Sequence, residues 1–231
     1  MHSSATGGRR RVVRPSRSVP ALVEPSPAPP AVDPVDPVDP VDPADARVGA
    51  LLDRLRAQWT RVGADIAGRL RPGVTEAELD AVTERTGLRV PAGARAWWRR
   101  VDGVEAVRTR YRSSSPTVGP GGWVPLRLAD ALERSAGTGV GPGTPPGLLP
   151  LFARDEELVA VRLGGTATVV EHLALVEARD GYQHGWRVDL EVLLGTWADS
   201  LLAAVVWLPE SHDWVVDPFA VQAMPLRHLL D

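Results

Sequence analysis

The clearest pattern in this chain is a repeat of apolar residues at helical spacing between residues 48 and 70. Positions three and four apart are apolar, and most positions between them are polar, as in a helix that buries one face. Pro72 and Gly73 follow at once and end the pattern. We therefore predict an amphipathic helix over this segment. Its apolar positions are Val48, Leu51, Leu52, Leu55, Trp59, Val62, Ile66 and Leu70.

A second pattern, between residues 73 and 103, predicts two short helices around a tight corner. Thr75 and Glu78 have the spacing of a capping box, which starts the first helix. Gly87 supplies the left-handed residue that ends it, and Pro91 suits the first turn of the second helix. The pattern therefore fixes both ends of the corner.

Four apolar residues of this corner are candidates for the core. We expect Leu88 and Val90 to point inward, because they alternate around an arginine. Trp97 lies on the apolar face of the second helix. Trp98 lies about 100° further round that helix, so we expect it at the edge of the core.

Beyond residue 103 the chain alternates between strand-like runs and turns, and one long helical pattern closes it. Helices, then antiparallel strands, then a helix is the order of an α+β fold, so we predict N-terminal helices, a mostly antiparallel sheet and a C-terminal helix packed on it. The segment after residue 207 is divided by prolines and indicates no element. The expected strands are Glu105–Tyr111, Trp123–Leu126, Leu148–Phe152, Leu158–Leu163 and Thr166–Val176, with helices over Leu128–Arg134 and Leu190–Trp207.

This order of features resembles the SUKH superfamily, which includes fungal cell-wall assembly regulators and bacterial immunity proteins. The resemblance rests on an acidic capped helix, a Gly-Leu-x-Val-Pro corner and an aromatic helix ending in Asp-Gly, and it extends over residues 48–206. Family members usually have a Gly-rich acidic turn where this chain has residues 154–157. The three segments are Thr75-Glu76-Ala77-Glu78, Gly87-Leu88-Arg89-Val90-Pro91 and Trp97-Trp98-Arg99-Arg100-Val101-Asp102-Gly103.

The resemblance implies a non-enzymatic protein-binding module, commonly an immunity protein that neutralises a cognate toxin. The residues also allow an alternative, a helix-turn-helix DNA-binding regulator over residues 75–101 with Arg95, Arg99 and Arg100 on its second helix. Against this alternative, Trp97-Trp98 occupies the face that would enter the groove, and the chain is slightly acidic.

Residues 1–46 differ from the rest of the chain in composition. An arginine-rich start is followed by Val-Asp-Pro units between residues 32 and 43. Proline at every third position favours an extended polyproline II spacer, and the segment has no apolar face to bury. We predict a disordered, solvated tail, with a docking arm as the alternative. A single domain is expected over residues 47–231, in which residues 207–231 are an unassigned extension.

The composition limits the classes of function. The chain has no cysteine, which excludes disulfides and thiolate metal sites and fits a reducing, cytoplasmic location. A net charge of −3 favours neither nucleic acid nor an anionic membrane as partner, and no apolar run approaches the roughly 20 residues of a membrane span. All 26 basic residues are arginine, which we attribute to a GC-rich bacterial genome rather than to phosphate binding.

No spacing of residues indicates a catalytic or metal site. The five histidines lack metal-ligand spacing, although Asp180 with His184 offers a weak metal pair. His172 follows Glu171 in a predicted strand, so their side chains should point to opposite faces. Residues 119–122 lack the Lys-Ser/Thr of a phosphate loop, and we expect a flexible surface loop there. We predict no enzymatic activity, no cofactor and no metal.

The partner-binding residues are expected in turns at the ends of strands, where loops carry binding groups on a rigid scaffold. One turn near residue 155 is acidic, and a second near residue 184 is aromatic. Rings and carboxylates together supply hot-spot anchors and a charged rim, which suits a basic partner such as a nuclease toxin. The predicted partner-binding residues are Trp123, Asp155, Glu156, Glu157, Tyr182, Trp186 and Arg187.

Overall fold

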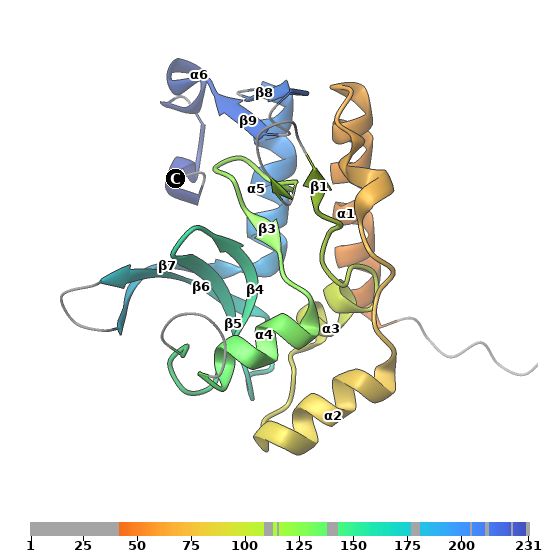
Figure 1. Ribbon diagram of the computed structural model, residues 1–231, viewed down its shortest axis with the longest axis vertical. Coiled ribbons are helices and arrows are strands. Elements are labelled where there is room, and N and C mark those ends of the chain that lie inside the picture. The colour runs from red at the N-terminus through yellow and green to blue at the C-terminus, as the bar shows by residue number, and fades with distance from the viewer. Residues whose placement is uncertain are drawn as a thin grey trace, which may run out of the picture. The chain divides into compact units, whose positions relative to one another are not determined.

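The computed structural model describes residues 42–108, 113–114, 116–137, 143–176, 181–203, 205–210, 213–222 and 224–229. Helices precede an antiparallel sheet, and a further helix follows it (Figure 1). The fold is therefore α+β, as predicted. The elements before the sheet are α1 (Pro43–Arg61), η1 (Asp65–Arg69), α2 (Glu76–Thr86), α3 (Ala92–Trp98), β1 (Val107–Arg108) and β2 (Ser113–Ser114). Those of the sheet and beyond are β3 (Val124–Pro125), α4 (Leu128–Ser135), β4 (Leu148–Arg154), β5 (Glu157–Arg162), β6 (Val169–Val176), β7 (Gly181–Asp189), α5 (Leu190–Ala203), β8 (Val205–Leu208), β9 (Asp213–Val216), α6 (Pro218–Gln222) and η3 (Arg227–Leu229).

Helix α1 begins earlier than its apolar pattern indicates. Asp42 caps it by accepting a hydrogen bond from the Ala44 N–H at 2.8 Å, and Pro43 occupies the first turn, where no N–H is needed. Residues 43–46 therefore belong to the helix, and assigning them to the tail was wrong. The rest of the predicted tail, residues 1–41, lies outside the described residues.

The predicted helix over residues 48–70 is divided in two. Helix α1 ends at Arg61, and Gly63 takes a left-handed φ of 76°. The turn η1 then continues the buried stripe through Ile66. The apolar spacing was correct, but the glycine interrupts the helix.

The corner between α2 and α3 forms as predicted. The Thr75 hydroxyl accepts from the Glu78 N–H at 3.3 Å, and the Glu78 carboxylate accepts from the Thr75 N–H at 2.8 Å, which completes the capping box. Gly87 ends α2 at a φ of 69°. Pro91 then caps α3.

Two apolar expectations at this corner were wrong. Leu88 is exposed whereas Val90 is buried, and between them the Arg89 carbonyl accepts a hydrogen bond from the Gly164 N–H at 2.7 Å. Trp98 is fully buried rather than at the edge of the core. Helix α3 contacts both α1 and α5, so positions on different sides of this short helix are covered.

The main sheet is antiparallel, with strand order β3-β4-β5-β6-β7. Strands β3 to β6 fall within or close to the predicted runs, although β3 and β6 are shorter than expected, whereas β7 lies where a turn was predicted. The strand expected over residues 105–111 appears only as β1, and residues 109–112 lie outside the described residues. Side chains alternate between two faces. We name the face with Phe152 and His172 the aromatic face, and the face with Glu171 and Arg187 the arginine face.

Helices α3 and α5 cover the aromatic face at Phe152. Its ring lies edge-on between Trp97 and Trp197, with centroid distances of 5.1 Å and 5.0 Å, and all three side chains are fully buried. Helix α1 runs beside α5 (Figure 1). The prediction that a helix after the sheet packs on it is thereby confirmed.

The segment before β3 is packed rather than flexible at the surface. Residues 116–120 are buried, and the Val118 carbonyl accepts a hydrogen bond from Trp59 Nε1 at 3.1 Å. A Cβ on Gly119 would come within 2.7 Å of the Trp197 ring, so glycine here permits close packing. The expectation of a surface loop at Gly119 was therefore wrong.

The chain after α5 forms a hairpin instead of continuing the helix to residue 207. Strands β8 and β9 pair, and the rings of Trp207 and Trp214 pack on the inner side with centroids 4.7 Å apart. Trp214 Nε1 donates to the Thr117 carbonyl at 3.0 Å, which fixes the hairpin to the segment before β3. Consecutive valines at 205 and 206 fit a helix by apolar spacing, but β-branched residues favour a strand where a partner strand exists.

Candidate functional site

The predicted acidic turn joins β4 to β5. Asp155 and Glu156 form it, and both are exposed. Asp155 takes a left-handed φ of 46°, a region that Asp tolerates better than most residues. Arg154 and Glu157 close the turn, with Arg154 Nε donating to the Glu157 carboxylate at 2.8 Å. Two exposed carboxylates thus project from a turn whose base is held by an ion pair.

His172 lies in contact with three of the predicted partner-binding residues. Its ring stacks on Trp186 with centroids 5.3 Å apart, and it meets Trp123 edge-on at 5.8 Å. Its Nε2 lies 3.5 Å from the Glu157 carboxylate. Trp123, Glu157 and Trp186 therefore gather around one imidazole on the aromatic face, next to the acidic turn.

A bulge in β7 makes this stacking fit. Gly185 and Trp186 together lie opposite His172, where the register between β6 and β7 shifts. A Cβ on Gly185 would come within 2.4 Å of His172 Nδ1. Glycine at this position therefore leaves the space that the imidazole occupies.

Trp123 supports the site from beneath and is not itself an anchor at the surface. It is fully buried, which corrects its predicted role in direct contact with a partner. The Arg154 guanidinium lies 4.6 Å above its ring and donates to the Gly121 carbonyl at 3.0 Å. Trp186, in contrast, is half-buried and keeps part of its surface open.

The environment of His172 favours the neutral imidazole. Burial lowers the pKa of His172 below its ordinary value, and the nearby Arg154 acts in the same direction. Glu157 opposes this shift but does not overcome it. The ring therefore serves as an uncharged stacking surface near neutral pH.

The predicted aromatic turn is in fact strand β7, and its residues do not form one cluster. Trp186 lies on the aromatic face, whereas Tyr182 and Arg187 lie on the arginine face. Tyr182 is half-buried against an apolar cluster that includes Leu158 and Leu173, and this burial raises the pKa of its phenol. Tyr182, Trp186 and Arg187, all predicted to bind the partner, therefore do not share one face of the sheet. Asp180, the other half of the weak metal pair, lies outside the described residues.

Arg187 instead belongs to a charged group around Glu171. The Glu171 carboxylate is only 6% exposed, and Arg162 Nε donates to it at 2.8 Å. His184 Nδ1 lies 3.1 Å from the second carboxylate oxygen, and Arg187 Nε lies 3.6 Å from the first. As predicted, Glu171 and His172 point to opposite faces.

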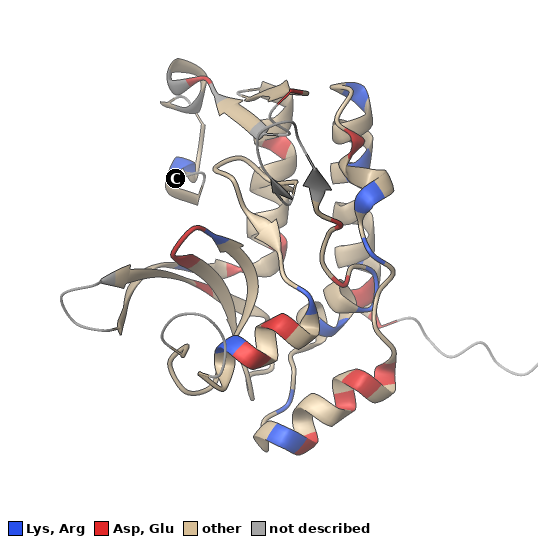
Figure 2. Cartoon of the chain, in the orientation of Figure 1, with Lys and Arg blue, Asp and Glu red and all other residues tan. Residues whose placement is uncertain are grey.

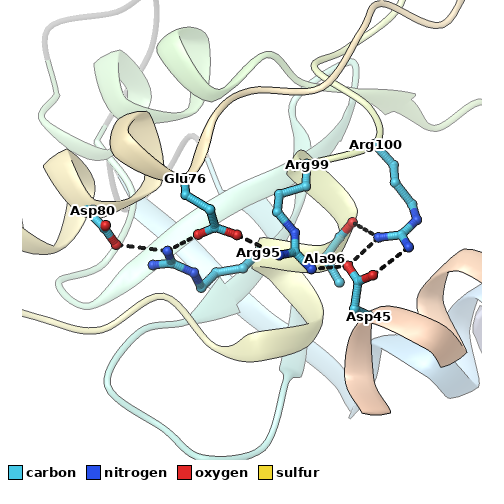
Figure 3. Close-up of polar contacts among 7 residues, drawn as sticks. All are labelled: Asp45, Glu76, Asp80, Arg95, Ala96, Arg99 and Arg100. Atoms are coloured by element: carbon cyan, nitrogen blue, oxygen red, sulfur yellow. Dashed lines mark hydrogen bonds and ion pairs between the residues drawn. The ribbon is translucent and has the colours of Figure 1, made fainter. Parts of the chain in front are cut away.

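A separate ionic network ties α1, α2 and the end of α3 together (Figure 3). Arg95 pairs with Asp80 at 2.8 Å and with Glu76, and Arg99 pairs with Glu76 at 2.6 Å and with Asp45. Arg100 completes the chain with a 2.7 Å hydrogen bond to Asp45.

The network shifts the pKa of its carboxylates. The Arg100 hydrogen bond, opposed by burial and assisted by Arg99, lowers the pKa of Asp45 to about 2. Burial raises the pKa of Glu76, but Arg95 and Arg99 outweigh it and hold that pKa below its ordinary value. Asp45 therefore stays ionised well into the acid range, and the ionised form of Glu76 is also favoured.

This network bears on the DNA-binding alternative. Arg95, Arg99 and Arg100 are the cations that a recognition helix would offer to DNA, and each is paired with carboxylates of its own chain. The neighbouring α2 carries four acidic residues and one arginine, drawn as red and blue segments in Figure 2. A groove of about 970 Å³ between α2, α3 and residues 164–166 has the same mixed charge. The arrangement favours an internal structural role for these arginines.

Two further kinds of site are not seen in the described ranges. No helix there is long and apolar enough to cross a membrane. Within the same ranges, no three His, Asp or Glu side chains gather closely enough to hold a metal ion.

Sequence reasoning missed His172 and Arg154, which organise the site. The sequence held one signal, the Gly185-Trp186 pair, but this pair identifies the site only when the register between β6 and β7 is known.

Comparison with models of known protein families and with curated proteins gives no match to this chain.

Proposed function

We propose that this chain is a non-enzymatic protein-binding module of the SUKH kind, acting in the bacterial cytoplasm as an immunity protein that neutralises a cognate toxin. The observation that carries the proposal is the pairing of an exposed acidic turn with a half-buried tryptophan on a rigid support. The resemblance of residues 48–206 to that family supplies the biological role.

The support matters because binding costs less when the contact groups are already ordered. Trp186 is stacked on His172, and the Arg154–Glu157 pair fixes the base of the turn. Asp155 and Glu156 therefore project from a defined turn, next to Glu157, whose carboxylate lies 3.5 Å from the imidazole on which Trp186 stacks. Aromatic anchors supply much of the affinity of an interface, while exposed charges chiefly set partner choice and association rate.

The mechanism would be occlusion. A basic toxin domain would place its cationic surface against Asp155 and Glu156 and an apolar side chain against Trp186. The bound module would then cover the surface that the toxin needs for its own substrate. No chemical step by this chain is required.

The test is survival of cells that express a toxin domain encoded beside this chain, with wild-type or variant protein co-expressed. Asp155→Asn/Glu156→Gln removes both charges and keeps a residue that tolerates the left-handed turn. We expect this variant to lose protection, and purified proteins to show weaker, less salt-dependent binding.

Glu84→Gln is the matched control, since it removes an exposed carboxylate from α2 instead. It should protect as well as wild type. If wild type protects against no neighbouring toxin, the proposed function is wrong. If both variants protect equally, the assigned surface is wrong.

A further inference from the structure

The outer side of the β8–β9 hairpin is apolar and exposed. Val206 and Val215 are direct cross-strand partners on that side, and they are 61% and 49% exposed. Leu208 lies two residues beyond Val206 on the same side and is also exposed. Single exposed apolar residues are common, but a contiguous group is typical of an interaction surface.

Phe219 follows this hairpin and is the most exposed large apolar side chain in the described part of the chain, at 81%. Its position is fixed, because the N–H groups of Phe219 and Ala220 donate to the Asp217 carboxylate at 2.9 Å and 3.2 Å. The chain's other phenylalanine, Phe152, is fully buried. A capped turn therefore holds an aromatic ring in solvent.

The hairpin is also firmly supported. Trp207 and Trp214 are buried on its inner side, and the Trp214 indole is hydrogen-bonded to Thr117. The inner side anchors the hairpin to the core while the outer side stays open. This is the construction of a preordered docking surface, in which little conformational freedom is lost on binding.

Charge indicates the kind of partner. Residues 205–231 contain four acidic residues and one arginine, a net −3 that equals the net charge of the whole chain. The remaining 25 arginines balance the remaining 25 acidic residues. Two copies of a segment with this net charge would repel each other, which argues against a second copy as the occupant. The charged residues are Glu210, Asp213, Asp217, Asp231 and Arg227.

We propose that the outer side of β8–β9 together with Phe219 is a docking surface for a basic protein partner, which offers an apolar recess rimmed by lysine or arginine. The inference rests on the proposed protein-binding function and adds to it a surface and a partner chemistry. It assigns this role to the extension that the sequence left unassigned.

The test uses a phage-displayed library of random peptides selected on the full chain. We expect enriched peptides to combine a large apolar residue with lysine or arginine, and their binding to weaken with salt. Phe219→Ser should weaken binding of a synthesised consensus peptide by roughly tenfold or more, as loss of a hot-spot residue does. The paired change Val206→Thr/Val215→Thr, which keeps strand-forming residues, should weaken it as well.

Val192→Ser is the matched control, because Val192 is exposed on α5, outside the hairpin and α6. It should leave peptide binding unchanged, and circular dichroism should show all variants folded. Absence of enrichment, enrichment of acidic peptides, or binding insensitive to Phe219→Ser would each overturn the inference. Self-association that Phe219→Ser abolishes in sedimentation velocity would also overturn it, in favour of a second copy.

These outcomes are separable from those of the toxin assay. If wild type protects cells but peptide selection fails, the docking surface is wrong and the proposed function stands. If selection succeeds but no toxin is neutralised, the surface binds basic proteins of another kind.

Discussion

Glu171 and His172 are neighbours in β6, yet they lie in opposite surroundings on the two faces of the sheet. His172 is packed between two tryptophan rings, and burial keeps its pKa low. Glu171 forms hydrogen bonds or ion pairs with two arginines and a histidine. Successive side chains of a strand point to opposite faces of the sheet, and this alternation alone places the two neighbours in different environments.

The two faces of the same sheet are therefore stabilised by different interactions. On the aromatic face, shape decides which residue fits, as at Phe152, Gly185 and His172. On the arginine face, charge decides, and the partners of Glu171 remain in contact with solvent. Substitutions should therefore be costlier among the fully buried rings around Phe152 on the aromatic face, where no solvent relieves them.

The largest effect is expected from Trp97→Ala, which removes one of the rings that enclose Phe152. We expect the free energy of unfolding to fall by about 3–5 kcal/mol, as for other buried aromatic residues replaced by alanine. Chemical denaturation measures this change. A loss below about 1 kcal/mol would contradict the enclosed aromatic face, because surface substitutions have effects of that size.

Glu171→Ala tests the arginine face. Removing a buried carboxylate leaves Arg162 and Arg187 close together without their shared partner. Because these arginines are 43% and 58% exposed, solvent relieves part of the repulsion, and we expect a loss of about 2–3 kcal/mol.

Glu171→Gln is the control for size, since it keeps hydrogen-bond acceptance and should cost less than the alanine change. Added salt should reduce the difference between Glu171→Ala and wild type. If the loss equals that of Trp97→Ala at every salt concentration, the two faces do not differ as argued.

Gly185→Ala tests the fit between the bulge and His172. The added methyl group would overlap the imidazole, and we expect a loss of about 1–2 kcal/mol from displaced side chains. The loss should be smaller when the same change is made in a His172→Ala background. Additive effects of the two changes in denaturation would show that the glycine is needed for another reason.

The smallest expected effect is the pH dependence due to His172. Its pKa is lower in the folded protein than in the unfolded chain, so the unfolded chain binds the proton more readily. This contribution to stability is present above the ordinary histidine pKa of about 6.5 and is lost as the pH falls below it.

His172→Phe keeps a ring for stacking and removes the titration. Between pH 7 and pH 5, its denaturation midpoint should fall less steeply than that of wild type. Equal slopes would mean that His172 titrates alike in the folded and unfolded states.

Local features were predictable from sequence because their causes are local. The capping box at Thr75, the left-handed Gly87 and the paired strands follow from short-range spacing. The end of α5 was not predictable in this way, because the valines before Trp207 become a strand only through pairing with β9.

The candidate site was less predictable, for a physical reason. Counting by twos from Trp186 places Tyr182 and His184 on its face, but the bulge at Gly185 moves both to the other face. His172 acquires its role only through Trp123, which directly precedes β3, and through residues of β5 and β7. Such contacts depend on register between distant strands, which residue spacing does not fix.

The bulge has one more consequence, for behaviour at high concentration. Within the described residues, β7 pairs only with β6, so its other edge faces no strand. A flat edge of this length would invite another chain to add a strand and begin an aggregate. The extra residue at Gly185 bends the edge, and the exposed Arg187 and Asp189 charge it. The same glycine that makes room for an imidazole thus helps to keep the protein from polymerising.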